Sequence, residues 1–468
     1  MKPGVFHKEV GHIFDRIIFS GSGSSNSSVT NDSSLEVEKK THNKFLNAIR
    51  SLKYKNFTMF LVHCFFSEAA SWSIMLVSIW LMYTLTESAL ATTLVVGLPT
   101  ISSLLIAPAV GVLADGMNRK QLLVYISLAQ GVVIGIFAVL VFMDQISVWY
   151  IYLLVFINGI FANARGPVRM SFLPNLVPKN LVLNAISLEV VTESFVRFLI
   201  PLTMGFVIKF FGSGIVLSIA AVLYIFSVLF LIQISIKSNG YHHIDIREFR
   251  GEFLGGVRYL ISERLILGTI CLMSVVLFCV ASINMGLLPI YAIKVFDVGS
   301  EGLGILLACC GIGITFAGIL TSFKSNQEGI NHSVMIRLVF VISIMYMIFS
   351  RITLFEIAVP FLVFSMILVG MFWLVSATYI QRKVQESFRG RISSLVTSCG
   401  GISVLFGLSF VGYMADIIGP QLATLLSCLI LITCTITFVI LRKHFFTDSI
   451  SIDQDSHIIS EKVVVSQQ

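Results

Sequence analysis

Four ionisable side chains lie within long apolar stretches of the sequence, where they could bind or carry protons. Glu68 is near the middle of the apolar stretch 57–83. Glu189, Glu193 and Arg197 follow one another at intervals of four residues, which places them on one face of a helix. An ionised side chain within a bilayer is expensive and usually faces a cavity or a partner. A carboxyl group there can exchange a proton with a membrane gradient, because burial disfavours its charged form.

A structural role competes with proton transfer at these positions. Glu193 and Arg197 are one helical turn apart, so a local ion pair would keep both charges fixed. Glu68 has no cationic neighbour on its own helix. We therefore interpret Glu68 as the leading candidate for proton coupling, followed by Glu193 and Arg197.

The composition requires a membrane protein. Of the 468 residues, 56% are hydrophobic and 12% are charged, which is too little charge to cover a soluble globule. A helix needs about 20 apolar residues to cross a hydrocarbon core of about 30 Å, and runs of this length exclude the alternating strands of a barrel. The predicted spans are 57–83, 90–113, 121–142, 148–165, 186–208, 214–235, 265–293, 302–322, 334–350, 357–380, 392–414 and 420–441.

The predicted fold is an all-α membrane protein with twelve transmembrane helices in two six-helix halves. The longest hydrophilic stretch between spans separates the halves. The chain then divides into a cytoplasmic, partly disordered N-terminal tail, a first half, a central cytoplasmic loop, a second half and a cytoplasmic C-terminal tail. Their boundaries are 1–55, 56–235, 236–264, 265–442 and 443–468.

Lysine and arginine set the orientation, since cytoplasmic loops retain positive charge during insertion. With the N-terminus inside, the outer loops carry only Lys209, Lys294 and Arg351. We expect a multi-pass protein of the cell membrane with both termini in the cytoplasm, surrounded by the lipid bilayer. The inner loops account for the formal charge of +7, so no nucleic-acid partner is needed.

Neither an enzyme nor a metal protein is indicated. The sequence has no CxxC pair, HExxH helix or Walker A loop, and all eight cysteines lie in apolar spans. We expect no catalytic residue, no metal site and no cofactor, and energy from an ion gradient or from the gradient of the substrate.

A short charged loop between the second and third spans carries a motif. GVLADGMNRK, from Gly111 to Lys120, resembles the G-x-L-a-D-r-x-G-r-k loop of major facilitator superfamily transporters, although Gly116 and Asn118 depart from it. The resemblance implies that Asp115 braces a cytoplasmic gate against the start of helix 11. The implied gating residues are Gly111, Asp115, Arg119, Lys120, Arg389 and Arg391. A plainer interpretation is that Arg119 and Lys120 are ordinary charges at a helix end.

Three further segments resemble the branch that contains macrolide efflux proteins and the enterobactin exporter. They are LTES at 85–88, LPNLVPKNLVLNA at 173–185 and RGRISSL at 389–395, and the likeness extends over about residues 52 to 442. It implies a substrate site near the bilayer midplane between two rocking halves. Helix 5 has only Pro201 and Gly205 where antiporters of the superfamily often have Gly-Pro and further glycines.

Aromatic and sparse polar side chains suggest the substrate. The candidates for the cavity wall are Trp72, Asn158, Asn284, Trp373 and Gln381. This mixture suits an amphiphilic organic molecule. Sugars would need more hydrogen-bonding groups, and a strongly anionic metabolite would need more intramembrane cations than Arg197. Each aromatic residue has packing or lipid contact as its alternative role.

These observations predict a monomeric secondary transporter. It would export a small amphiphilic compound, either a drug-like molecule in multidrug efflux or a siderophore-like metabolite, by proton antiport and alternating access. Uptake of a small nutrient and a transporter-like membrane receptor are the alternatives. A receptor would need a sensing domain, and the sequence shows none.

Overall fold

The computed structural model describes residues 50–116, 118–235, 255, 257–322 and 332–440, and the side chains of 104–116 and 387 fall outside this description. The transmembrane helices of the first half are α3 to α8. Their bounds are Lys55–Thr86 (α3), Ala89–Gly116 (α4), Arg119–Phe142 (α5), Val148–Phe172 (α6), Val182–Phe211 (α7) and Ser213–Ile232 (α8).

The second half continues with six spans. Its bounded elements are Arg264–Val276 (α10), Leu288–Ile290 (α11), Ser300–Ser322 (α12), His332–Phe349 (α13), Phe355–Lys383 (α14) and Arg389–Ile418 (α15), followed by a last helix, Pro420–Ile440. Eleven described segments are long and apolar enough to cross a membrane, and α4 is the twelfth span, of which Ala89–Ser103 is the part with described side chains. The all-α fold with twelve spans is confirmed.

Two helices differ from the predicted spans in ways that matter for the site. The sequence placed the end of the fourth span at Arg165 and assigned Arg169 to an inner loop, whereas α6 continues to Phe172 and contains both arginines. Its interior Pro167 does not end the helix. Both arginines pair with acidic side chains inside the bundle, so the last turns of α6 can be helical without water around these charges.

The seventh span is irregular. Between α10 and α12, the chain forms three π-helical turns at Leu277–Ala281, Ile283–Leu287 and Tyr291–Val295, with α11 between the last two. Such turns are rare and often lie at functional sites. Asn284 belongs to the second of them.

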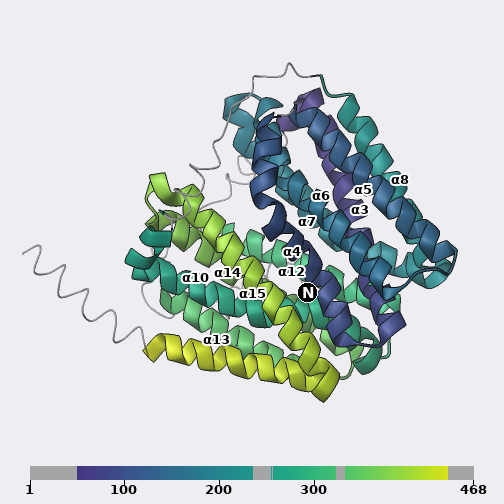
Figure 1. The fold of residues 1–468 in the computed structure, drawn as a ribbon. Helices are drawn as coiled ribbons and strands as arrows, with labels where there is room; N and C mark the ends of the chain where they lie inside the picture. Colours follow the sequence, from purple (N-terminus) through teal and green to yellow (C-terminus); the bar gives the residue numbers. More distant parts are fainter. Residues whose placement is uncertain (1–49, 117, 236–254, 256, 323–331, 441–468) are drawn as a thin grey trace, which may run out of the picture.

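The helices form two groups that meet along two seams (Figure 1). Within the first group, α3 and α5 pack against α8, and α4 and α5 pack against α6. Within the second, α12 and α13 pack against α14. The seams are the contacts of α7 with α12 and of α4 with α15.

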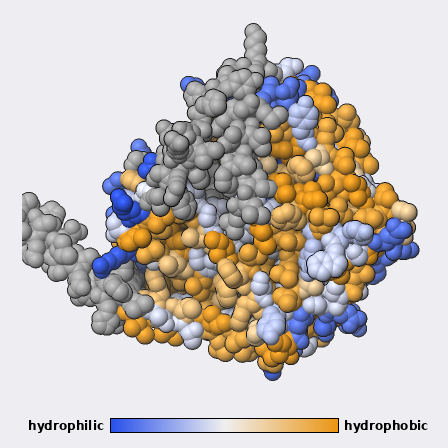
Figure 2. Space-filling view, viewed as in Figure 1, coloured by the Kyte–Doolittle hydropathy of each residue, from blue (hydrophilic) through white to orange (hydrophobic). Residues whose placement is uncertain are grey.

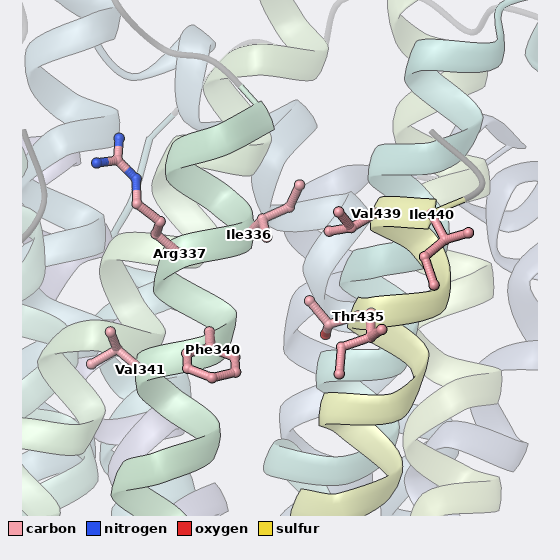
Figure 3. Close-up of a pocket in the computed structure, with 8 residues that line it drawn as sticks. Ile336, Arg337, Phe340, Val341, Thr435, Val439 and Ile440 are labelled. Carbon is pink, nitrogen blue, oxygen red and sulfur yellow. The ribbon is translucent and has the colours of Figure 1, made fainter. Parts of the chain in front are cut away.

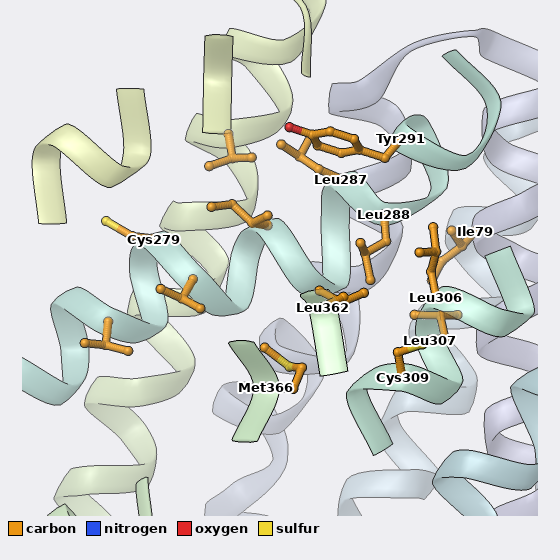
Figure 4. Packing of buried hydrophobic residues seen from close by; sticks show 14 of the residues in the cluster. Ile79, Cys279, Leu287, Leu288, Tyr291, Leu306, Leu307, Cys309, Leu362 and Met366 are labelled. Carbon is orange, nitrogen blue, oxygen red and sulfur yellow. The ribbon is translucent and has the colours of Figure 1, made fainter. Parts of the chain in front are cut away.

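Apolar packing continues across the boundary between the groups. One buried cluster includes Ile79 of α3 together with Leu288, Leu306 and Leu362 of the second half (Figure 4). The outer surface in view is largely hydrophobic, with hydrophilic residues at its margins (Figure 2). Both properties fit a bundle surrounded by lipid.

Candidate functional site

Glu68 lies in an ion-pair cluster within the first half. Its Oε1 accepts hydrogen bonds from Arg165 Nη2 at 2.9 Å and Arg169 Nη1 at 3.0 Å. Both arginines come from α6, four residues apart and on the same face. Glu68 has no cationic neighbour on its own helix, and both of its partners come from α6.

Arg169 is the centre of this cluster. Besides Glu68, its guanidinium pairs with Glu193 of α7, and its Nε lies 2.7 Å from Glu189 Oε1. Three carboxylates therefore surround one guanidinium, and only 12% of the arginine side chain is exposed. Glu189 is 3% exposed and Glu193 is 28% exposed, so Glu193 is the more accessible acid of α7.

Arg165 is fixed by neutral groups as well as by Glu68. It donates to the Ser67 carbonyl and the Tyr224 hydroxyl at 3.3 Å, and to Ser71 Oγ at 3.2 Å. The Tyr224 hydroxyl and Ser71 Oγ are 2.8 Å apart. These contacts join α3, α6 and α8 around the buried charge.

Arg197 is on the predicted face of α7 but does not form the ion pair with Glu193 that was the alternative to a role in proton coupling. Glu193 contacts Arg169, and the Arg197 guanidinium lies 5.5 Å from the centre of the Trp72 ring on α3. This is a cation–π geometry. The local Glu193–Arg197 ion pair is therefore not formed, because Arg169 of α6 pairs with Glu193 instead.

One seam between the halves is closed by Asp416 near the end of α15. Its carboxylate accepts hydrogen bonds from Ser88 Oγ at 2.7 Å, from the Ala89 amide at 2.6 Å and from the Leu90 amide at 3.0 Å. These donors form the start of α4, where free amides and the helix dipole favour an anion. An acid of the second half thus caps a helix of the first.

The other seam is closed at the same end of the bundle. Ser300 Oγ donates to the Gly205 carbonyl at 3.0 Å, and Lys209 Nζ lies 2.5 Å from Glu301 Oε1. A Cβ atom at Gly205 would be 2.7 Å from the Ser300 carbonyl oxygen, so a larger residue cannot fit between α7 and α12. Both seams are tight at the end of the bundle where α7 ends and α12 begins.

The predicted gating residues are only partly described. Gly111 and Asp115 lie in the last turns of α4, and their side chains fall outside the described residues. Arg119 donates to the Ser171 carbonyl at 2.9 Å, and Lys120 to the Ile232 and Ile234 carbonyls at 2.7 Å. These contacts are with α6 and with the end of α8, where the last carbonyls of a helix accept hydrogen bonds from cations.

The predicted gate residues at the start of α15 both contact neighbours in the chain, and Arg391 also lies beside Gly255. Arg389 Nη1 lies 3.3 Å from Glu386 Oε1, and the Arg391 guanidinium lies 5.3 Å from the Phe388 ring centre. Their role in a gate with Asp115 stays a prediction.

The predicted cavity residues do not form one site. Asn158 Oδ1 accepts from Gln130 at 3.2 Å within the first half, and Asn284 Oδ1 accepts from Tyr346 at 2.8 Å within the second. Each asparagine is 8% exposed, which fits a role in packing between helices. Trp373 and Gln381 are exposed on α14, and Trp72 alone lies beside the charged cluster.

A separate groove lies between α13 and the last helix (Figure 3). It has a volume of about 330 Å³, and Phe340, Ile436 and Ile440 are among the apolar residues that line it. Arg337 is its charged residue, and the ion-pair cluster is in the other half. The groove does not contribute to the candidate site.

Sequence reasoning missed three residues of these sites: Arg165, Arg169 and Asp416. The spacing held a signal for two of them, since Arg165 and Arg169 repeat at the same four-residue interval as Glu189 and Glu193. Nothing in the sequence linked Asp416 to the start of α4, because 326 to 328 residues separate the partners.

Comparisons with known proteins agree with this architecture. The staphyloferrin A transporter of Staphylococcus aureus strain NCTC 8325 is 22% identical over 371 residues, which cover 76% of this chain and 88% of that protein. A bacterial homologue of the human lysosomal transporter Spinster, solved inward-facing and unoccupied, aligns with a TM-score of 0.68 at 12% identity, over 85% of this chain and 98% of that one.

The nucleoside transporter NupG aligns with a TM-score of 0.60 at 15% identity, over 83% of this chain and 99% of that one. At these identities the solved structures show a shared fold only. The sequence profile of one family, described as transmembrane secretion effector, matches residues 47–465. The chain therefore belongs to this family of major facilitator superfamily transporters.

Proposed function

We propose that this protein exports a small amphiphilic organic compound across the cell membrane by proton antiport. The family description supports secretion, and the similarity to a staphyloferrin A transporter favours a siderophore-like metabolite over a drug-like cargo. A monomer is sufficient, because the ion-pair cluster and both seams lie within one chain.

The observation that carries the proposal is the convergence of Glu68, Glu189 and Glu193 on Arg169. A proton on one carboxylate removes its charge and weakens its attraction to the guanidinium. Because the acids come from α3 and α7 and the arginine from α6, this change alters how three helices are held together. Protonation can thereby favour a different arrangement of the first half.

We assign the transported proton to Glu68. It bonds both arginines of α6, so its neutralisation releases two charged contacts, whereas each acid of α7 pairs with Arg169 alone among the described residues. Glu193 is the most exposed of the three acids and gives solvent protons access to the cluster. After export of the cargo, Glu68 would bind a proton from outside and release it inside.

Alternating access supplies the route. The seams at Asp416 and Ser300 close the end of the bundle where α7 ends and α12 begins. The distribution of Lys and Arg predicts that this end faces the outside. Cargo would enter from the cytoplasm in this arrangement, and separation of the two seams would release it outside.

The orientation is tested by single cysteines in a background without the native ones. A cysteine in place of Asp144, between α5 and α6, should react with an impermeant maleimide in intact cells. A cysteine in place of Lys179, between α6 and α7, should react only after the cells are opened. The reverse pattern would contradict the orientation.

The transport mechanism is tested in everted vesicles with a panel of siderophores and drug-like amphiphiles. Imposing a proton gradient should drive accumulation of the cargo. Glu68→Gln should abolish this accumulation while retaining exchange of labelled for unlabelled cargo, because the amide keeps the shape but carries no proton.

Glu356→Gln is the matched control, since Glu356 is exposed in the first turn of α14. It should transport normally. Gradient-driven accumulation by Glu68→Gln at the normal rate would remove Glu68 from coupling. Uptake by intact cells without accumulation in everted vesicles would replace export with import.

A further inference from the structure

We propose that Arg197 and Trp72 form a subsite that binds a carboxylate group of the cargo. This inference rests on the proposed transport function and narrows its substrate to amphiphiles that carry one carboxylate beside an apolar body. It begins from an asymmetry among the three arginines that α6 and α7 bring to the cluster.

Two of those arginines are satisfied within the protein. Arg165 bonds a carboxylate, a carbonyl and two hydroxyl groups, and Arg169 contacts three carboxylates. Arg197 makes no hydrogen bond or ion pair with any described residue, and its Nε is buried without an acceptor. A buried donor left without an acceptor costs about 1–3 kcal/mol, and more when it is charged. This guanidinium has the capacity to bind an anion.

The position of Arg197 matches where a cargo must pass. It lies near the middle of α7, and Trp72 lies near the middle of α3. A Cβ atom at Gly311 of α12 would be 3.2 Å from the Arg197 carbonyl carbon, so this turn of α7 borders the second half. Both side chains are partly exposed. A midplane position at the boundary between halves is where such transporters bind substrate.

The local geometry favours a carboxylate. The central carbon of the Arg197 guanidinium lies 5.5 Å from the centre of the Trp72 ring. An arginine in contact with an aromatic ring can still donate two parallel hydrogen bonds to a carboxylate. Arg197 is one cation, so it matches one carboxylate. The apolar body of the ligand has a surface beside it, because Phe65, Trp72 and Met204 pack on a cluster of Ala69, Val196 and Ile200.

Equilibrium binding to the purified full-length protein in nanodiscs tests the subsite. The probes are radiolabelled 2-naphthylacetate and its neutral amide, which differ in the carboxylate. The protein should prefer the acid by about 10-fold or more, as expected for a charge-assisted hydrogen bond of about 1.5–3 kcal/mol. Arg197→Gln should remove this preference, and Trp72→Leu should weaken binding of both probes.

Arg197→Lys separates the effect of the bidentate guanidinium geometry from that of the positive charge. It also replaces Arg197→Gln as the test variant if that variant does not fold. It should keep a smaller preference for the acid, because an ammonium group cannot form the bidentate contact. Arg337→Gln is the matched control, since this exposed arginine of α13 donates to the Ser333 carbonyl of its own helix and to no other described residue. It should bind the probes as the parent does.

Equal binding of acid and amide by the parent protein, or an undiminished preference in Arg197→Gln or Arg197→Lys, would overturn the subsite. The assay uses no gradient, so its outcome is independent of proton coupling. If Arg197→Gln loses the preference while the parent shows no proton-driven transport, the subsite stands and the antiport proposal fails.

Discussion

The two halves of the bundle differ in how they use polar groups. The first half holds three glutamates and three arginines on α3, α6 and α7. In the described part of the second half, no aspartate, glutamate, lysine or arginine is buried. Its buried polar contacts include neutral pairs such as Tyr346 with Asn284, and its ion pair Arg389–Glu386 is exposed. The two halves share a helical layout but differ in whether ionisable side chains are buried inside them.

This difference indicates a division of labour. Charges inside a membrane are expensive and are retained where they bind an ion, a proton or a substrate. Under the proposed function, proton binding and anion recognition belong to the first half, because the buried charges of the described residues lie there. Asp416 and Glu301 connect the halves at one end, outside the central cluster.

The largest effect is expected from Arg169→Gln. This change leaves Glu68, Glu189 and Glu193 without their shared partner, and removing one member of a buried ion pair typically costs about 3–5 kcal/mol. We expect a large fall in the midpoint of thermal unfolding in detergent. Adding Glu189→Gln should restore part of the stability, because one unpaired charge is then removed. No recovery in the double variant would contradict electrostatic pairing.

A smaller effect is expected at the contact between halves. Asp416→Asn weakens three hydrogen bonds to the start of α4, each worth about 1.5–3 kcal/mol as a charged contact. Closure of this end should become less favourable. Spin labels at Asp144 and Arg351 should report longer distances by double electron–electron resonance. An unchanged distance distribution would show that Asp416 does not hold this end closed.

The predicted gate at the other end gives the opposite expectation. If Asp115 braces the cytoplasmic side, Asp115→Asn should destabilise closure there and shorten the distances between the same labels. It should reduce transport without lowering membrane abundance. Normal transport at normal abundance would remove Asp115 from the gate.

The smallest effect is expected in the second half. Tyr346→Phe removes the hydroxyl that donates to Asn284 Oδ1, a neutral hydrogen bond worth about 1 kcal/mol. The unfolding midpoint should fall much less than in Arg169→Gln, and proton-driven transport should continue. Loss of proton coupling in this variant would break the comparison and place part of the mechanism in the neutral half.

Predictions from the sequence succeeded where local chemistry decides. Apolar runs determined the twelve spans, because a helix that satisfies its own backbone is the solution for a continuous apolar segment in lipid. The repeat of Glu189, Glu193 and Arg197 determined a shared face of α7. Predictions of side-chain partners failed where the partners come from different helices. Glu193, for example, pairs with Arg169 of α6 and not with Arg197 of its own helix.

The sequence by itself determined the membrane class, the spans and the presence of charges within them, because hydropathy and helical periodicity are local properties. Only the tertiary structure decided which charges meet. Glu68 and Arg165 are 97 residues apart, and their contact depends on how α3 and α6 are rotated and packed. In that same packing Arg197 contacts the Trp72 ring and forms no ion pair with a described residue, since Arg169 of α6 pairs with Glu189 and Glu193.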